Sequence, residues 1–182
     1  MITIQQDTRE QTKKHDHVLK YFAAEGIKVV RSKLYVGDYT RLDKQDVCID
    51  TKKDLQEVYG NVILHNVRFK EECIRAKEAG IRLVVLIADE HIRHISEVHT
   101  WVNPRIRKWE TVKAAQEKGK LMQIKLSPRP PVSSEQLQRA METMGERYGV
   151  EWRFCPKAET GRRILEILGV KEVKAWQTEV HL

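Results

Sequence analysis

The protein is a chain of 182 residues, 41% of them hydrophobic and 32% charged, with a formal net charge of +7. A chain of this length and composition is expected to form one globular domain with a sizeable core. A membrane partner is not expected, because no apolar run approaches the roughly 18 residues that span a bilayer and the start lacks a signal-peptide pattern. Three cysteines without Cys-x-x-Cys spacing argue against structural zinc and a disulfide framework.

The charge is unevenly distributed along the chain. Residues 1–99 carry 17 basic and 16 acidic residues, whereas residues 100–182 carry 16 basic and 10 acidic residues. An acidic cluster in the first half and a basic excess in the second fit a metal site paired with a phosphate-binding surface. A solvated basic face without a partner explains the charge alone equally well.

The first half of the chain alternates between strand and helix patterns. Apolar alternation predicts a first strand that presents Asp7, and Thr12 is placed to cap a helix that Gly26 ends. Further strands are expected over 27–34, 35–40, 47–52 and 82–88, a helix over 65–79, and a helix or loop over 54–64. The unbroken apolar run in 82–88 is typical of a strand covered by helices on both faces. This order predicts an α/β sandwich.

The second half is less regular. Residues 90–120 are strongly charged and difficult to assign, a strand is expected over 121–126, and residues 127–132 read as a connecting loop. Ser133 and Gln136 form the capping-box start of a helix that runs to Tyr148. A strand over 150–154 and a last helix that Gly169 terminates complete the predicted elements.

Two aspartates and a lysine form the sharpest candidate site. Side chains on a strand alternate between faces, so Asp50 and Lys52 of the 47–52 strand project from the same side. A carboxylate can hold a hard divalent cation through oxygen, and the lysine can orient a water or stabilise charge that builds on a phosphate. Asp38 lies twelve residues before Asp50 and adds a second carboxylate. The alternative is a set of surface charges around a strand.

Three stretches, Asp7-Thr8-Arg9-Glu10-Gln11, Gly37-Asp38-Tyr39 and Ile49-Asp50-Thr51-Lys52-Lys53-Asp54, resemble the nuclease domain of the XPF/Hef excision-repair and fork-processing endonucleases. That family belongs to the PD-(D/E)XK superfamily. The motif of the family reads Gly-Asp, a spacer, then Glu-Arg-Lys-x-x-x-Asp. The resemblance covers roughly residues 1–90 with good order and spacing. The sequence has Asp50 where the motif has glutamate, which the superfamily pattern allows, and Thr51 where the motif has arginine. The final aspartate of the motif falls at Gln56; Asp54 and Glu57 lie close by but out of register.

The resemblance implies a restriction-endonuclease-like fold, in which helices flank a central mixed sheet, as a single domain over 1–182. It also implies a Mg²⁺ or Mn²⁺ cofactor. The expected catalytic residues are Asp7, Asp38, Asp50 and Lys52, and the expected metal ligands are Asp7, Asp38, Asp50 and the backbone carbonyl of Thr51.

Supporting and DNA-contacting residues are expected around this set. The supporting residues are Arg9, Glu10 and Glu72; a structural salt bridge explains Arg9 equally well, and a solvated intrahelical pair is the favoured interpretation of Arg68 with Glu72. The expected DNA contacts are Arg68, Trp101, Arg105, Arg107, Lys108 and Trp109, because aromatic rings can stack on bases while cations contact phosphates. Tryptophans eight residues apart are at least as often core anchors of a helix.

The expected function is a metal-dependent DNA endonuclease that leaves 5′-phosphate and 3′-hydroxyl ends. A non-catalytic DNA-binding or adaptor protein that keeps the fold is the alternative, to which Gln56 gives weight, and nuclease chemistry on RNA is a third reading. No helicase phosphate loop occurs, and the segment after Gly169 is too short for the helix-hairpin-helix pair of longer family members. A stand-alone enzyme of a phage or bacterium is therefore expected, in the cytoplasm, with DNA as partner and a second copy or a recruiting protein left open.

Overall fold

The computed structural model describes residues 2–9 and 16–170, and a six-stranded sheet in the order β2-β1-β3-β4-β5-β6 forms its centre. The strands are β1 (Thr3–Gln6), β2 (Lys28–Arg31), β3 (Tyr39–Arg41), β4 (Val47–Lys52), β5 (Arg82–Ala88) and β6 (Glu151–Cys155). β3 is antiparallel to both β1 and β4, and the other neighbouring strands are parallel. The sheet is therefore mixed.

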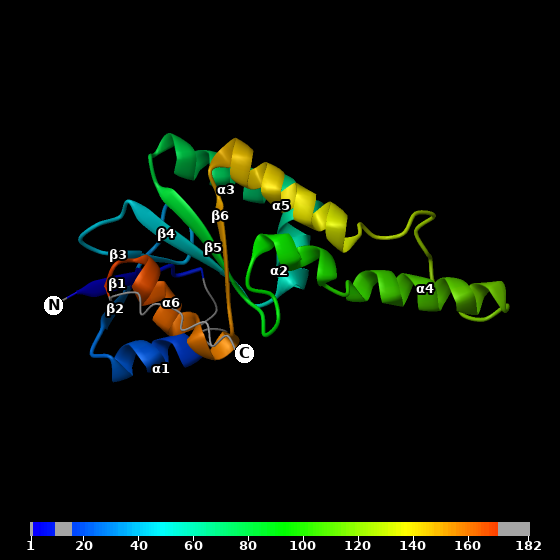
Figure 1. Ribbon diagram of the computed structural model, residues 1–182, viewed down its shortest axis with the longest axis horizontal. Coiled ribbons are helices and arrows are strands. Elements are labelled where there is room, and N and C mark those ends of the chain that lie inside the picture. The colour runs from blue at the N-terminus through cyan, green and yellow to red at the C-terminus, as the bar shows by residue number, and fades with distance from the viewer. Residues whose placement is uncertain (1, 10–15, 171–182) are drawn as a thin grey trace, which may run out of the picture.

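Helices cover both faces of this sheet (Figure 1). They are α1 (Asp16–Ala24), α2 (Leu55–Tyr59), α3 (Asn66–Glu78), α4 (Pro104–Glu117), α5 (Ser134–Tyr148) and α6 (Thr160–Ile167). Shorter turns are the π-helix η2 (Gly60–Leu64) and the 3-10 helices η3 (Ile95–Thr100) and η4 (Lys157–Glu159). Apolar side chains of α1 and α6 form one core with the sheet, and those of α2, α3 and α5 form a second core on the opposite face.

The alternation in the two central strands explains this double burial. Ile49 and Val84 belong to the core beneath α1 and α6, whereas Cys48 and Leu83 belong to the core beneath α2, α3 and α5. Asp50 and Lys52 follow Cys48 at every second position, so all three side chains lie on the same face of β4. Both charged side chains are therefore directed toward the layer that contains α2 and α3.

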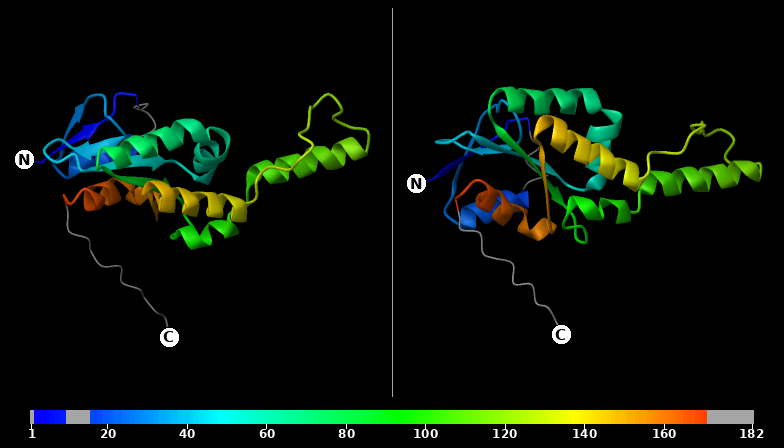
Figure 2. Two further views of the ribbon diagram at one scale, coloured as in Figure 1. Left: turned by 90° about the horizontal axis from the view of Figure 1, so that it is seen from above. Right: turned by 45° about the horizontal axis from the view of Figure 1, so that its top comes forward.

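One part of the chain leaves this sandwich. Figure 2 shows α4 and the segment after it extending away from the sheet and returning to α5. We refer to residues 102–132 as the arm. Val112 is the one buried residue of α4, and the returning segment is held to the helix by Gln116, whose Nε2 donates to the carbonyl oxygen of Ile124 at 2.7 Å.

The strands 47–52 and 82–88 have the predicted bounds, and α3 and α5 lie where helices were expected. The strand predicted over 121–126 is wrong, since these residues form turns in the arm. No strand of the described residues lies beside the arm to pair with this segment, and Leu121 has a left-handed φ of 54°.

The strands predicted over 27–34 and 35–40 are also shorter than expected. β2 ends at Arg31 and β3 begins only at Tyr39. Between them the backbone turns toward the end of β1, because the Leu34 amide donates to the Asp7 carboxylate at 2.9 Å. Thr12, Glu10 and the segment 171–182 lie outside the described residues. Among the helices that are described, none has the length and apolar character needed to cross a membrane.

Candidate active site

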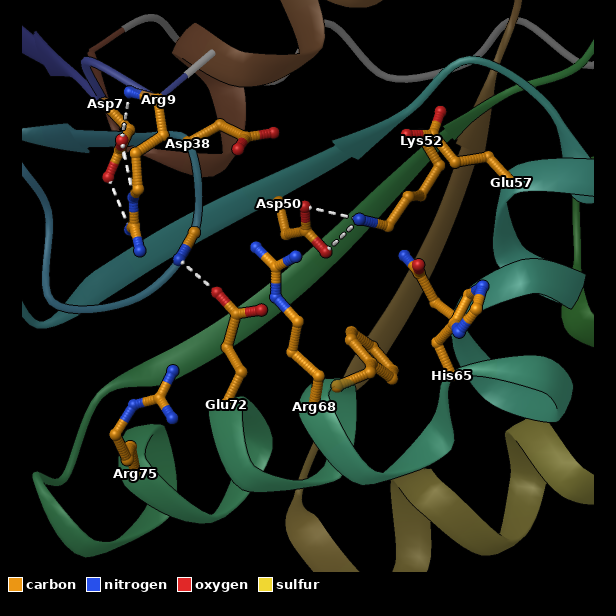
Figure 3. A pocket seen from close by; sticks show the side chains of 13 residues that line it. Asp7, Arg9, Asp38, Asp50, Lys52, Glu57, His65, Arg68, Glu72 and Arg75 are labelled. Carbon is orange, nitrogen blue, oxygen red and sulfur yellow. Dashed lines mark hydrogen bonds and ion pairs between the residues drawn. The ribbon is translucent and has the colours of Figure 1, made fainter.

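A cavity of about 540 Å³ lies between β4 and the helices α2 and α3 (Figure 3). The residues that line it are Asp7, Arg9, Gly37, Asp38, Asp50, Lys52, Glu57, Asn61, His65, Arg68, Phe69, Glu72 and Arg75. All four predicted catalytic residues are among them, although they come from three separate stretches of sequence. The fold therefore gathers the set in one place.

Asp50 and Lys52 form an ion pair inside the cavity. Nζ of Lys52 lies 2.7 Å from Oδ1 and 2.6 Å from Oδ2 of Asp50, and both side chains are at least nine-tenths buried. Burial raises the pKa of Asp50, against the opposing charge of Lys52. Burial alone would lower the pKa of Lys52, but the charges of Asp50 and Asp38 outweigh it and raise that pKa above its ordinary value. These neighbours therefore favour the protonated form of Lys52.

Asp38 connects three strands at the edge of the cavity. Its backbone N–H donates to the Ile49 carbonyl at 2.7 Å, and its own carbonyl accepts from the Asp7 amide at 2.9 Å. Its carboxylate oxygen Oδ2 accepts from both the backbone N–H and the hydroxyl of Thr51, at 2.7 Å each. These bonds fix the carboxylate beside the chain between Asp50 and Lys52.

The residue before Asp38 has to be glycine. Gly37 has a φ of +71°, and a Cβ there would lie 3.0 Å from the Ile49 carbonyl oxygen. Its amide donates to Glu72 of α3 at 2.9 Å. Glu72 of α3 thus holds the Gly37-Asp38 turn from across the cavity. Arg68 makes no ion pair with Glu72 within the described residues; in Figure 3 it points toward Asp50.

Asp7 is held by Arg9 and by the segment before the Gly37 turn. Its Oδ1 accepts from the backbone N–H and Nε of Arg9 at 2.6 and 2.9 Å, and Oδ2 accepts from Nη2 at 2.6 Å and from the Leu34 amide at 2.9 Å. Burial alone would raise the pKa of Asp7, but these hydrogen bonds hold it below its ordinary value. Each carboxylate oxygen of Asp7 therefore already accepts two hydrogen bonds, and in this structure Asp7 holds Arg9 and the backbone at Leu34 in place.

The donor set around Asp50 fits a hard divalent cation. Oδ2 of Asp50 is buried and accepts no hydrogen bond, although the Lys52 ammonium lies beside it. In a strand the N–H and C=O of one residue point to the same side, so the Thr51 carbonyl faces Asp38 as its amide does. Mg²⁺ is commonly held by one or two carboxylates and keeps several waters. The described residues hold no cluster of three or more His, Cys, Asp and Glu side chains suited to a metal.

Sequence reasoning placed the last acidic position of the motif at Gln56, but Glu57 is the residue that lines the cavity. Asp54 caps α2 by accepting from the Glu57 amide at 2.8 Å. This start of the helix leaves Gln56 exposed and directs Glu57 inward. The capping pattern Asp-x-x-Glu was the signal that could have placed it. His65 and Asn61 also line the cavity, and no motif pointed to Asn61.

The six predicted DNA contacts lie in three places: the cavity, the helix α4 and the core beside Tyr59. Arg68 lines the cavity, whereas Arg105, Arg107, Lys108 and Trp109 lie on α4. Trp101 precedes the arm and packs against the core beside Tyr59, with ring centroids 6.5 Å apart. The position of Trp101 agrees with the alternative interpretation, in which a tryptophan is packed in the core. Trp109 is half-buried within the arm, where its Nε1 donates to the Ser127 carbonyl at 2.9 Å.

A mixed six-stranded sheet with an Asp-x-Lys strand facing a helix-lined cavity defines a protein of the restriction-endonuclease-like fold. The model of the ERCC4 domain matches residues 6–167, so the chain belongs to the ERCC4 domain family. This confirms the predicted XPF/Hef-type resemblance and the predicted fold class, and it supports a nuclease.

Two solved structures share the fold. XPF from Aeropyrum pernix is 15% identical with a TM-score of 0.56, and the match covers 92% of this chain and 64% of that one. The structure of XPF from Aeropyrum pernix in complex with DNA is 15% identical with a TM-score of 0.57, covering 97% of this chain and 71% of that one. The chain thus spans about two thirds of the length of the XPF chains that it matches. No curated protein matches the sequence.

Proposed function

We propose that the protein is a divalent-metal-dependent DNA endonuclease. The observation that carries the proposal is the buried Asp50–Lys52 pair, which faces the cavity beside the fixed carboxylate of Asp38. Family membership supports a nuclease, and a structural relative that was solved with DNA supports DNA as the substrate.

Asp50, Asp38 and the Thr51 carbonyl would hold Mg²⁺ or Mn²⁺, which supplies Lewis-acid stabilisation of the phosphoryl oxygens when bound. Lys52 stays protonated, so it orients the attacking water and stabilises the charge that develops on the phosphate. The water oxygen would join phosphorus as the bond to the 3′ oxygen breaks, with the water proton passing to solvent and the 3′ oxygen taking a proton from solvent, which leaves a 5′-phosphate and a 3′-hydroxyl. Arg68, which also lines the cavity, would bind a phosphate oxygen.

Metal dependence is tested by cleavage of end-labelled single-stranded, duplex and forked DNA, and of RNA, with Mg²⁺, Mn²⁺ or EDTA. We expect cleavage with either metal and none in EDTA, because the two carboxylates need a cation to bring a phosphate into the acidic cavity. DNA binding without cleavage under every metal would favour the alternative, a non-catalytic DNA-binding protein of this fold. Preferential cleavage of RNA would assign the same chemistry to another substrate.

Glu57 is expected to contribute to this activity although it lies outside the motif. Its charge contributes to the raised pKa of Lys52, and it lines the same cavity as Asp50 and Asp38. Glu57→Gln should lower kcat about ten- to a hundred-fold, the usual range for a residue beside the metal ligands. Gln56→Ala, at the neighbouring exposed position, should leave kcat near that of the parent. Equal effects in the two variants would contradict this assignment.

The single-domain organisation over 1–182, association with a second copy and binding to a recruiting protein stay predictions. So does the cytoplasmic location in a bacterial or phage-infected cell. Size-exclusion chromatography with light scattering would measure the oligomeric state directly.

A further inference from the structure

The arm holds most of the excess positive charge of the chain. Residues 102–132 contain eight basic and two acidic residues, whereas the whole chain has a formal net charge of +7. Arg107 and Lys108 are exposed on α4. Neither takes part in a salt bridge of the described residues. A helix with one buried residue and this charge is suited to a polyanion.

The arm begins and ends at the wall of the cavity. The guanidinium carbon of Arg105 lies 5.3 Å from the centre of the Tyr59 ring, and the Val132 amide donates to the Tyr59 hydroxyl at 3.0 Å. Tyr59 is the last residue of α2, and the π-helix η2 that follows carries Asn61 into the cavity. A single aromatic residue therefore joins both ends of the arm to the cavity wall.

We propose that the arm binds the phosphate backbone of duplex DNA beside the scissile bond. The inference rests on the proposed function, because it takes the DNA in the cavity as the polymer that the arm contacts. DNA carries one charge for each 1.7 Å of its axis, so a duplex that leaves the cavity along α4 would present phosphates to the exposed cations of this helix.

The length of the arm sets the size of this contact. α4 has 14 residues, which span about 21 Å at about 1.5 Å per residue. At 3.4 Å per base pair this corresponds to roughly six base pairs of duplex. We therefore infer that the protein covers about six more base pairs than the cavity alone would, and that these contacts raise affinity without reading sequence.

Two variants test the arm, one by charge and one by removal. Arg107→Gln with Lys108→Gln removes two exposed cations, and Lys20→Gln with Lys28→Gln removes two from α1 and β2 at the other end of the molecule (Figure 1). In the second variant a short Gly-Ser linker replaces residues 104–131. The ends of this segment meet, since the Asn103 side chain donates to the Val132 carbonyl at 2.9 Å.

Affinity is measured in EDTA by fluorescence anisotropy, on labelled duplexes from about 8 to about 24 base pairs and over a range of salt. Removing the two arm cations should reduce the slope of log K against log salt by about 2 and weaken binding at least about ten-fold at 0.1 M salt. The Lys20 and Lys28 control should keep the parent values. The linker variant should reach its full affinity on a duplex shorter by roughly six base pairs.

An unchanged salt slope in the arm-charge variant, or the same length dependence with and without the arm, would overturn the proposal. Loss of an oligomer in the linker variant with unchanged DNA affinity would also overturn it, by assigning the arm to contacts between copies. Because EDTA prevents turnover, these results are independent of cleavage. A protein that binds through the arm but cleaves nothing with any metal would refute the proposed function and retain the arm as a DNA-binding element.

Discussion

Asp50→Asn is expected to reduce DNA cleavage by at least about a thousand-fold. The substitution keeps the shape of the side chain but removes the charge that would hold the cation and that pairs with Lys52 in this structure. Metal stabilisation of a phosphoryl transition state contributes several kcal/mol, and about 4 kcal/mol corresponds to three orders of magnitude in rate. The measurement is single-turnover cleavage of the best DNA substrate at saturating Mg²⁺ and Mn²⁺.

Asp46→Asn provides the matched control, because Asp46 lies just before the other end of β4 and is exposed. This variant should cleave at the parent rate. DNA binding in EDTA should change little in Asp50→Asn, which separates loss of chemistry from loss of affinity. Cleavage by Asp50→Asn within ten-fold of the parent would show that the metal, if it binds, is held elsewhere.

Lys52→Met is expected to abolish cleavage and also to destabilise the fold. The Asp50 carboxylate would remain in a site where its side chain is only 7% exposed, without the ammonium that now neutralises it. Breaking a buried pair on one side typically costs roughly 3–5 kcal/mol. Urea unfolding followed by circular dichroism would report this as a lower midpoint, with the slope against denaturant unchanged.

The double variant Asp50→Asn with Lys52→Met separates these two effects. It removes both charges, so we expect it to recover most of the lost stability while it stays inactive. The exposed pair of Lys44 and Asp46, 3.3 Å apart, is the control cycle and should show a coupling close to zero. If the double variant is as unstable as Lys52→Met alone, the pair is not an isolated charge interaction, and other groups in the cavity wall depend on it.

The parts of the site that follow from one strand could be predicted from the sequence. The alternation in 47–52 was sufficient to place Asp50 and Lys52 on one face, because a strand has a fixed period of two. The position of Glu57 could not be read from the motif, since it depends on where the next helix begins, and Asp54 sets that start as its N-cap. Helix starts are among the least certain features of a sequence.

The engagement of Asp7 and the arm depended on tertiary contacts that no local pattern records. The Leu34 amide donates to Asp7 from 27 residues along the chain, whereas the bonds from Arg9 are local. Residues 121–126 carry an apolar pattern of strand type, yet they lie in a projection with no partner strand, so the local preference did not decide their structure. The uneven charge, in contrast, was visible at once in the sequence and is concentrated in this projection.

The bonds of Asp38 have a consequence for how relatives of this protein can lose activity. Its carboxylate accepts from the backbone N–H and the hydroxyl of Thr51, so a substitution there leaves two buried donors of β4 without a partner as well as removing a charge from the site. Asp50 and Lys52 can be exchanged together for neutral residues at a smaller cost to folding. An inactive relative is therefore expected to have lost Asp50 and Lys52 together and to have kept Asp38, because Asp38 still supports β4 when the chemistry is gone.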